Sequence, residues 1–390
     1  MTNRDCGKVL AIQTRSAINP LFMKIVFIGG REIHILGGIE NYMLNLTREL
    51  TRLGHECIVW CESDHSEVEI LDGVKVIYQS GPKSNMLCKP WCGLKATVKT
   101  CVKEKNVSVI HYNAWPPSLW CWIPRMLGIP SLMEGHGLEW QRSKYSVRSR
   151  KVMKVMENVT AHLNQHLIMC SEGQVAYFQK EYGKDSVCIS GAVTLPDLEK
   201  ENASDILMRY GLLYKRYFLF MGRLVQDKNP DYLIRAFRKA KTDGFKLVVA
   251  GSNDAMPDYV AKLHQLGVDS DDIVFTGAVY GEDKAKLLQC AYCFCLPSTI
   301  EGLSIVMMEA ASYQLPTIAS DIDANREFLG DDAVYVRPEH EDDLINALEY
   351  AIANPERLNN YWNANYQKIV KYYTWDKVAL KYINYLHSIG

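Results

Sequence analysis

Short apolar runs alternate with longer amphipathic stretches through the first half of the chain. Runs such as Ile25 to Ile28 suit strands buried on both faces, and the stretches between them have the apolar spacing of helices that lie on a sheet. The predicted strands are 25–28, 56–61, 107–112 and 130–133, and the predicted helices are 39–53 and 94–105. This alternation is typical of βαβ units, whose right-handed crossovers form a parallel sheet covered by helices.

The same alternation starts again after residues 195–204, a polar stretch that suits a linker. The predicted strands are then 217–221, 245–250, 273–276 and 292–296, and the predicted helices are 231–240, 258–266 and 284–290. A last amphipathic helix is predicted at 375–389, with apolar positions at Val378, Leu380, Ile383 and Leu386. The pattern predicts an α/β fold of two doubly wound parallel-sheet domains facing a central cleft, where the ligands of such sheets bind.

The length of 390 residues exceeds what one hydrophobic core usually serves, which also favours two domains. We expect the first domain at 23–200 and the second at 201–373, with the helix at 374–390 completing the first. Residues 1–22 lack any periodicity, and we expect them to be a disordered leader.

Charge and cysteine content narrow the function. The net charge of -1 argues against a general nucleic-acid binder, although residues 1–200 carry 24 basic against 19 acidic side chains and form the basic half. The twelve cysteines follow no disulfide spacing and residues 1–22 contain no signal-peptide core, so we expect a cytoplasmic location. The chain also has no apolar run of the roughly 18 residues that span a membrane, so membrane contact is expected to be peripheral.

Two cations follow the predicted strand 217–221. Arg223 comes directly after Gly222, and Lys228 lies five residues further on. When the glycosidic bond of a nucleoside-diphosphate sugar breaks, two fixed cations can stabilise the departing diphosphate without a metal ion or other cofactor. A solvated pair in a surface loop is the alternative interpretation of these residues alone.

The segment 301–309 follows the predicted strand 292–296 and a Pro-Ser break. Glu301 is expected in the loop beside a bound sugar, and Glu309 in the next helix, where its carboxylate can accept ribose hydroxyl hydrogen bonds. A glycine lets the backbone approach a phosphate, and the free amides at a helix start can donate to it. The donor-binding residues expected here are Glu301, Gly302, Leu303, Ser304, Ile305 and Glu309.

Glycines mark three further loops of the expected cleft. Gly37 and Gly38 open the first helix and suit contact with a phosphate or an acceptor group, with a glycine hinge as the alternative. His136 lies between two glycines after strand 130–133, which exposes its ring and favours a hydrogen bond to the donor sugar. Gly251 begins a loop after strand 245–250 that is expected to line the base pocket.

These elements, in this order, resemble the retaining glycosyltransferases of family 4, which have the GT-B fold of two Rossmann-like domains. The resemblance covers residues 24–388. The matching positions are the glutamate pair Glu301 and Glu309, the phosphate-binding Arg223 and Lys228, the glycine loop Gly37-Gly38, the sugar-contacting His136 and the closing helix from Tyr373 onward. One departure is the segment 190–193, Ser-Gly-Ala-Val, where relatives tend to have Asn-Gly-Val.

The resemblance implies metal-independent transfer with retention at the anomeric carbon, from a nucleotide-sugar donor bound by the second domain to an acceptor on the first. Arg223 and Lys228 would hold the leaving diphosphate, while Glu301 and His136 would fix the sugar. None of the matched carboxylates is an obvious glycosidase-type nucleophile, so front-face attack is the hypothesis. The segments 136–142 and 109–112 further resemble a bacterial branch that includes rhamnosyltransferases of surface polysaccharides, which favours a rhamnosyl group and a glycan or polyprenyl-pyrophosphate-linked acceptor.

A basic run follows in the first domain, with three tryptophans upstream at 115, 120 and 122. Its members are Arg142, Lys144, Arg148, Arg150, Lys151 and Lys154. Either they form a solvated face, or they attract anionic lipid or a lipid-pyrophosphate acceptor at the inner face of the plasma membrane.

Two motifs carry less information than their spacing suggests. Cys290, Cys293 and Cys295 resemble half a zinc site, but their alternation fits a buried strand. His162 and His166 have the spacing of a zinc-protease helix but lack its glutamate, which favours a solvated helix face.

Other functions remain as alternatives at this point. A nucleotide-sugar epimerase of the same architecture would need no acceptor, and a non-enzymatic sugar-binding protein would normally carry a signal peptide. A dehydrogenase is disfavoured because no Gly-x-Gly-x-x-Gly follows either first strand.

Overall fold

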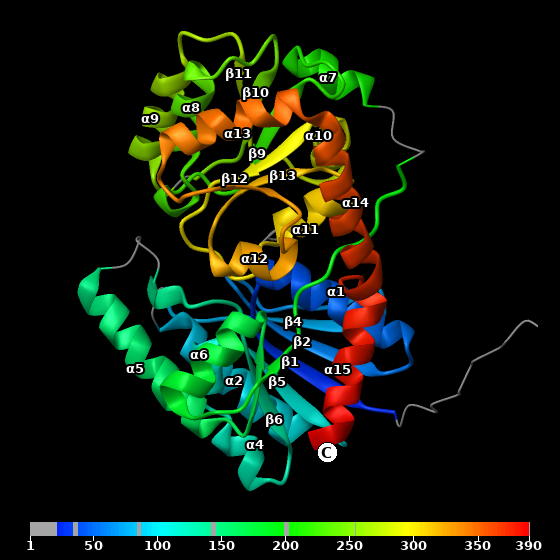
Figure 1. Cartoon of the computed structure of the whole chain (residues 1–390). Helices are drawn as coiled ribbons and strands as arrows, with labels where there is room; N and C mark the ends of the chain where they lie inside the picture. Colours follow the sequence, from blue (N-terminus) through cyan, green and yellow to red (C-terminus); the bar gives the residue numbers. More distant parts are fainter. Residues whose placement is uncertain are drawn as a thin grey trace, which may run out of the picture.

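The computed structural model describes residues 22–33, 38–83, 87–141, 146–198, 203–253 and 255–389. Two α/β halves lie one above the other, and the last helix runs beside the first half (Figure 1). The predicted leader falls outside the described residues except for Phe22.

The first half is built on a sheet with strand order β3-β4-β2-β1-β5-β6-β7-β8, in which every neighbouring pair is parallel except β3 and β4. Its strands are β1 (Lys24–Arg31), β2 (Glu56–Ser63), β3 (Val68–Leu71), β4 (Val74–Ser80), β5 (Val109–Asn113), β6 (Ser131–Gly135), β7 (His166–Met169) and β8 (Val187–Cys188). Its helices are α1 (Gly38–Arg52), α2 (Cys88–Lys103), α3 (Trp115–Ser118), α4 (Trp122–Met126), the 3-10 turn η1 (Glu139–Gln141), α5 (Val147–Leu163) and α6 (Glu172–Tyr182).

The second half is built on a wholly parallel sheet with strand order β11-β10-β9-β12-β13-β14. Its strands are β9 (Tyr217–Met221), β10 (Lys246–Ala250), β11 (Ile273–Gly277), β12 (Cys293–Leu296), β13 (Thr317–Ser320) and β14 (Val334–Val336). The helices are α7 (Ser204–Tyr210), the 3-10 turn η2 (Gln226–Lys228), α8 (Pro230–Lys239), α9 (Pro257–Gly267), α10 (Gly281–Cys290), α11 (Ile305–Ser312), α12 (Asp323–Leu329), α13 (Glu341–Ala353) and α14 (Pro355–Tyr372). The last helix, α15 (Trp375–Ile389), returns to the first half.

Each sheet has a hydrophobic core on both faces, as a sheet covered by helices on two sides requires. All five residues of the central strand β9 are buried, which is why its sequence is a continuous apolar run. The predicted two-sheet α/β architecture is therefore confirmed.

The last helix, α15, packs into the core of the first sheet through residues such as Val378, Tyr382 and Leu386. The prediction that Leu380 belongs to this apolar face was wrong, because 47% of Leu380 is exposed. Residues spaced by four along a helix share one face, and position 380 points away from the face formed by 378, 382 and 386.

The chain crosses between the halves twice, and the two crossings pair. Val193 forms a parallel bridge with Thr374, and its backbone N–H donates to the carbonyl of Tyr373 at 2.9 Å. In the segment flagged at 190–193, an ideal Cβ on Gly191 would lie 2.5 Å from Ile305 Cδ1. The glycine thus lets the start of α11 pack against the crossing.

The sequence pattern missed the antiparallel strand β3 at the sheet edge. Its residues alternate between exposed and half-buried, so it has no continuous apolar run. A signal was present, because Asp72 and Gly73 have φ of +53° and +83° in the turn to β4, as an Asp-Gly hairpin turn requires. The pattern also placed the start of α2 six residues late, at 94 rather than at Cys88.

Among the described residues, no helix has both the length and the apolar character needed to cross a membrane.

Candidate functional site

A cleft with a cavity volume of ≈ 270 Å³ lies between the two halves. Its lining from the first half is Gly137, Leu138, Gln141, Ser171, Gly173 and Gln174. The lining from the second half is Arg223, Val225, Asp227, Lys228, Met256, Ile300, Glu301, Gly302, Asp323, Ala324 and Glu327. Most of these residues follow the carboxyl ends of strands, where open α/β sheets bind their ligands.

Four predicted residues, Arg223, Lys228, Glu301 and Gly302, come together in this lining. Arg223 follows β9, and Lys228 ends η2 in the same loop. The Lys228 ammonium forms an ion pair with the Glu301 carboxylate, with side chains only 19% and 8% exposed respectively. The charge of Lys228 is therefore balanced by Glu301 at a largely buried position. An anionic ligand would compete with Glu301 for the Lys228 ammonium.

Gly251 supports this loop from beneath. An ideal Cβ on Gly251 would lie 1.9 Å from the carbonyl oxygen of Gly222, so a side chain has no room there. The Gly222 N–H in turn donates to the Ala250 carbonyl at 3.0 Å. Gly222 and Gly251 are not among the described residues that line the cleft. Both glycines instead support the backbone next to Arg223.

The loop from Glu301 reaches across to the first half before α11 begins. An ideal Cβ on Gly302 would lie 3.7 Å from the His136 carbonyl oxygen and 3.4 Å from Gln174 Nε2. Helix α11 follows at Ile305 with the buried Ser304 as its N-cap, and the Ser304 side chain makes no capping hydrogen bond. Leu303, Ser304 and Ile305 therefore sit where the chain turns from the cleft into a helix.

Glu309 lies within α11 and outside the described cleft lining. Its Oε1 is 2.5 Å from Lys284 Nζ on α10, with exposed fractions of 19% for Glu309 and 29% for Lys284. Lys284 was not predicted as a site residue, because nothing in its sequence neighbourhood connects it with Glu309. The expected ribose contact stays a prediction.

His136 lies directly after β6, and 17% of its side chain is exposed. Its Nδ1 is 3.8 Å from Glu134 Oε1, its Nε2 is 3.4 Å from Asn113 Oδ1, and its ring meets that of Tyr42 edge-on at 5.3 Å between centroids. Burial lowers the pKa of His136 and Glu134 acts in the opposite direction, which leaves the imidazole mainly neutral at pH 7. The next two residues, Gly137 and Leu138, line the cleft.

Gly38 begins α1, with no heavy atom within 4 Å of its ideal Cβ position, so its surroundings are open. Gly37 lies outside the described residues.

The sequence pattern missed the contribution of α6 and α12. Ser171 is the N-cap of α6 and accepts from the Gln174 N–H at 3.3 Å, and both residues line the cleft. Glu327 of α12 reaches this helix start from the other half, where it accepts from the N–H groups of Glu172 at 2.7 Å and Gly173 at 3.1 Å. The sequence could have identified Ser171 as the N-cap of a helix. It could not have shown that Glu327, 155 residues beyond Glu172, contacts this helix start.

The basic run proves to be heterogeneous. Arg148, Arg150 and Lys151 lie on the first turns of α5, while Arg142 and Lys144 fall outside the described residues. Lys154 does not belong to a solvated face, because its Nζ lies 4.6 Å from the ring centroids of both Trp140 and Tyr177. Only one of the upstream tryptophans, Trp122, is well exposed, at 45%.

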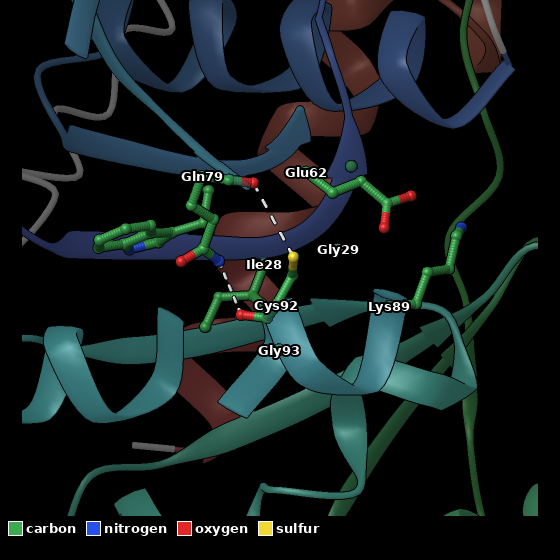
Figure 2. A pocket seen from close by; sticks show the side chains of 9 residues that line it. Ile28, Gly29, Glu62, Gln79, Lys89, Cys92 and Gly93 are labelled. Atoms are coloured by element: carbon green, nitrogen blue, oxygen red, sulfur yellow. Dashed lines mark hydrogen bonds between the residues drawn. The ribbon is translucent and has the colours of Figure 1, made fainter. Parts of the chain in front are cut away.

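A second, small cavity of ≈ 10 Å³ lies at the ends of β1, β2 and β4, against α2 (Figure 2). Gln79 lines it, with Nε2 donating to the Cys92 carbonyl at 2.7 Å, while the side chains of Glu62 and Lys89 point toward one another. Among the described residues, Glu62 with Cys88 and Cys92 is one of two groups close enough to hold a metal ion, the other being Glu32, Asp64 and His65. Neither group belongs to the cleft lining, and metal independence stays a prediction.

The two weaker motifs separate in the structure. Cys290, Cys293 and Cys295 are buried cysteines at and around β12. His162 is on the last turn of α5, but His166 begins β7, so the prediction that both histidines share a helix face was wrong. The helix ends because Asn164 leaves the helical conformation, with φ of -78° and ψ of 138°.

Two family models match the chain. Residues 36–194 match the model described as Glycosyltransferase Family 4, and residues 215–354 match the model described as Glycosyl transferases group 1.

Similar proteins cover the whole length or one part of it. An uncharacterized glycosyltransferase of Methanocaldococcus jannaschii is 26% identical over 375 residues, which are 90% of this chain and 94% of that protein. The O-antigen chain mannosyltransferase of Salmonella typhimurium is 31% identical over 153 residues, 38% of this chain and 42% of that protein. The solved structure of sucrose-phosphate synthase from Thermosynechococcus elongatus has the same fold, with a TM-score of 0.81 at 19% identity over 94% of this chain and 99% of that one.

Proposed function

Because the chain belongs to the family 4 glycosyltransferases, with the GT-B fold, we propose that it transfers a hexosyl group from a nucleoside-diphosphate sugar to a glycan acceptor in surface-polysaccharide biosynthesis. The observation that carries this proposal is the meeting of Arg223, Lys228 and Glu301 in one interdomain cleft. The two cations match the negative charge of a diphosphate, and the Glu301 carboxylate can accept hydrogen bonds from a neutral sugar.

The diphosphate is proposed to bind Arg223 and Lys228, with Gly302 and the start of α11 on its other side. On binding, the phosphate oxygens replace Glu301 as partners of Lys228, and the freed Glu301 carboxylate accepts hydrogen bonds from sugar hydroxyls. Glu309 is proposed to hold the ribose, which requires it to leave Lys284.

The reaction is proposed to retain the anomeric configuration without a metal ion. The bond from the anomeric carbon to the phosphate oxygen breaks, and its electron pair stays on that oxygen. The acceptor hydroxyl attacks from the same face and passes its proton to the departing oxygen. Arg223 and Lys228 stabilise the charge that develops on the diphosphate, while Glu301 and His136 fix the sugar.

The rhamnosyl group and the polyprenyl-pyrophosphate-linked acceptor remain predictions for the transferred sugar and its destination. A lipid-linked acceptor would bring the enzyme to the inner face of the plasma membrane. Support comes from α5, which has Arg148 and Lys151 beside exposed valines at 152, 155 and 159.

The first test is a thermal-shift series with UDP, GDP, dTDP, ADP and CDP in the presence of EDTA. One diphosphate at 100 times its Kd should stabilise the wild-type protein by about 2.7 kcal/mol, and Arg223→Ala should abolish the shift. A matched control is Arg209→Ala, which removes an arginine that is half exposed and paired with Asp283 away from the cleft.

Retention of the shift in Arg223→Ala, or its equal loss in Arg209→Ala, would contradict the donor site. A diphosphate that binds only when Mg²⁺ replaces EDTA would contradict metal independence while leaving the transferase assignment intact. Product analysis with the stabilising donor then identifies the transferred sugar.

A further inference from the structure

A chain of buried polar residues runs from the last helix to His136. The Tyr382 hydroxyl on α15 lies 2.9 Å from Nδ1 of His111 on β5, and His111 Nε2 lies 3.0 Å from Glu134 Oε2 on β6. The other oxygen of Glu134 faces His136 Nδ1 at 3.8 Å. Tyr382, His111 and Glu134 are all fully buried, so this chain is sealed from solvent except at His136.

The pKa shifts of these buried residues indicate which of their atoms carry a proton. Burial lowers the pKa of His111 to about 3, so its ring is neutral at pH 7, and burial raises the pKa of Tyr382 well above its usual value, so the phenol keeps its proton. The Tyr382 O–H can therefore donate to His111 Nδ1, which leaves the proton of His111 on Nε2, facing Glu134. The second oxygen of Glu134 then faces His136.

Glu134 is unusual among the buried acids of the described chain. Neither of its oxygens receives a well-aligned hydrogen bond, and the same is true of the neighbouring Tyr42 hydroxyl and of His111 Nε2. A buried carboxyl without aligned donors costs stability, and such groups are concentrated at functional sites. By contrast, Glu157 is equally buried but accepts hydrogen bonds from Tyr177 at 2.8 Å and Tyr182 at 2.6 Å.

We propose that Glu134 is the positioning residue of His136, at the end of the buried relay Tyr382–His111–Glu134. When its carboxylate is ionised, it keeps the proton of His136 on Nδ1 and leaves Nε2 as a hydrogen-bond acceptor. Nε2 faces Asn113 Oδ1 at 3.4 Å, so in this state the Asn113 amide must turn its partnerless Nδ2 toward the ring. Hydrogen bonds of this kind are often long in unliganded proteins and shorten with substrate, in line with the 3.8 Å separation. The catalytic consequence rests on the proposed sugar contact of His136.

The relay also joins the site to the crossing between the halves. Helix α15 starts at Trp375, one residue after the Thr374 bridge, and the Trp375 and Tyr42 rings lie 6.0 Å apart between centroids. Tyr42 in turn touches His136. A movement of the crossing at domain closure would therefore reach His136 from two sides.

The pH dependence follows from the environment of Glu134. Burial raises its pKa to about 7, and His136 and Tyr42 act in the opposite direction. The other titratable groups near these side chains are His111, Tyr382, Cys170 and Lys89. Since the carboxyl titrates near 4.5 when unfolded, its raised pKa costs stability that is absent below pH 4.5, grows between pH 4.5 and about 7, and stays constant above that. The variant Glu134→Gln removes that cost, so at pH 8 it should melt no lower than the wild type.

The decisive experiment is an NMR titration of protein labelled with ¹³Cε1-histidine, in which the variant His136→Asn assigns the resonance of His136. In the wild type, this resonance should move through a transition near pH 7 as Glu134 ionises. Glu134→Gln should lose the transition, and the control Glu157→Gln should keep it. An unchanged transition in Glu134→Gln would overturn the proposal, whether or not the protein transfers sugar.

Kinetics provide the second readout, with the donor found in the thermal-shift series. Glu134→Gln should lower kcat by on the order of 10–100-fold, as expected when a group that orients a catalytic side chain is removed, with KM for the donor little changed. The wild-type rise of kcat/KM through about pH 7 should be absent in this variant. Tyr382→Phe should lower kcat less, and Glu157→Gln should leave the profile in place.

If Glu134→Gln keeps the wild-type kcat and pH profile, Glu134 has only a structural role. If the wild type transfers no sugar from any donor, the proposed function fails while the NMR result still stands.

Discussion

The positions of individual residues at the edge of the cleft depend on close contacts at glycines and on an ion pair between two side chains. Gly251 makes room for the Gly222 carbonyl oxygen, Gly302 lies against Gln174 of the first half, and Glu301 forms an ion pair with Lys228. Each contact is local in space but joins segments tens of residues apart. A single added carbon atom can therefore disturb a loop elsewhere in the sequence.

Gly251→Ala tests this scale directly. Its Cβ would stand 1.9 Å from the Gly222 oxygen, so the end of β9 must shift, at a cost of about 1–3 kcal/mol. Thermal unfolding should show a melting temperature lower by several degrees, together with weaker stabilisation by the diphosphate that binds the wild type. Gly38→Ala is the matched control for stability, because its added carbon meets no neighbour. Equal melting temperatures for Gly251→Ala and the wild type would contradict the close approach.

Among the elements, α5 has an exposed face that is unusual for a protein surface. Val152, Val155 and Val159 recur at spacings of three and four and are 46%, 62% and 43% exposed. Arg148, Arg150 and Lys151 lie on the same helix. A helix that combines exposed apolar and basic residues is suited to the surface of an anionic membrane.

Replacing Arg148, Arg150 and Lys151 by Gln should weaken binding to vesicles of anionic lipid at low salt. At about 1 kcal/mol per basic side chain, the partition coefficient should fall by on the order of 100-fold. Vesicle co-sedimentation measures it, and the same charge change at Lys239, Lys241 and Lys262 in the second half is the control. Binding that survives the triple replacement in α5, or fails equally in the control, would leave α5 as a solvated face.

Val152→Ser with Val155→Ser should weaken the binding that remains at high salt, where the charges are screened.

At the scale of the whole molecule, the described contacts between the two halves include the paired crossings and contacts between side chains and helix ends. One of them is Glu327, whose carboxylate caps the first amides of α6 in the other half. Such a contact between a carboxylate and a helix start contributes about 0.5–2 kcal/mol. That amount is small enough for a substrate to overcome when the cleft opens.

Glu327→Ala should shift the unliganded protein toward a more open arrangement without unfolding either half. Small-angle X-ray scattering should then give a larger radius of gyration than for the wild type, with the difference reduced by the bound diphosphate. Asp331→Ala, which removes an exposed carboxylate paired with Arg326 near the same helix, should leave the radius unchanged. Identical scattering from Glu327→Ala and wild type would show that this contact does not hold the halves together.

The sequence by itself determined the two parallel sheets, because strands buried on both faces must be apolar runs and the helices between them must have an apolar stripe. Strand β9 and helix α15 were predicted with their observed bounds, and Arg223, Lys228, Glu301 and Gly302 were placed at one cleft. These residues follow strand ends, and in a parallel sheet all such ends lie on one edge. Local pattern was therefore enough to find them.

Only the tertiary structure decided which distant residues meet. The Lys284 partner of Glu309, the Glu327 cap of α6 and the relay from Tyr382 to His136 join elements separated by 25 to 271 residues. Nothing in the local spacing of a tyrosine on the last helix points to a histidine on β5. Such pairs depend on how helices and strands pack after the chain has crossed between the halves, and that packing sets the burial, and with it the pKa, of Glu134 and His111.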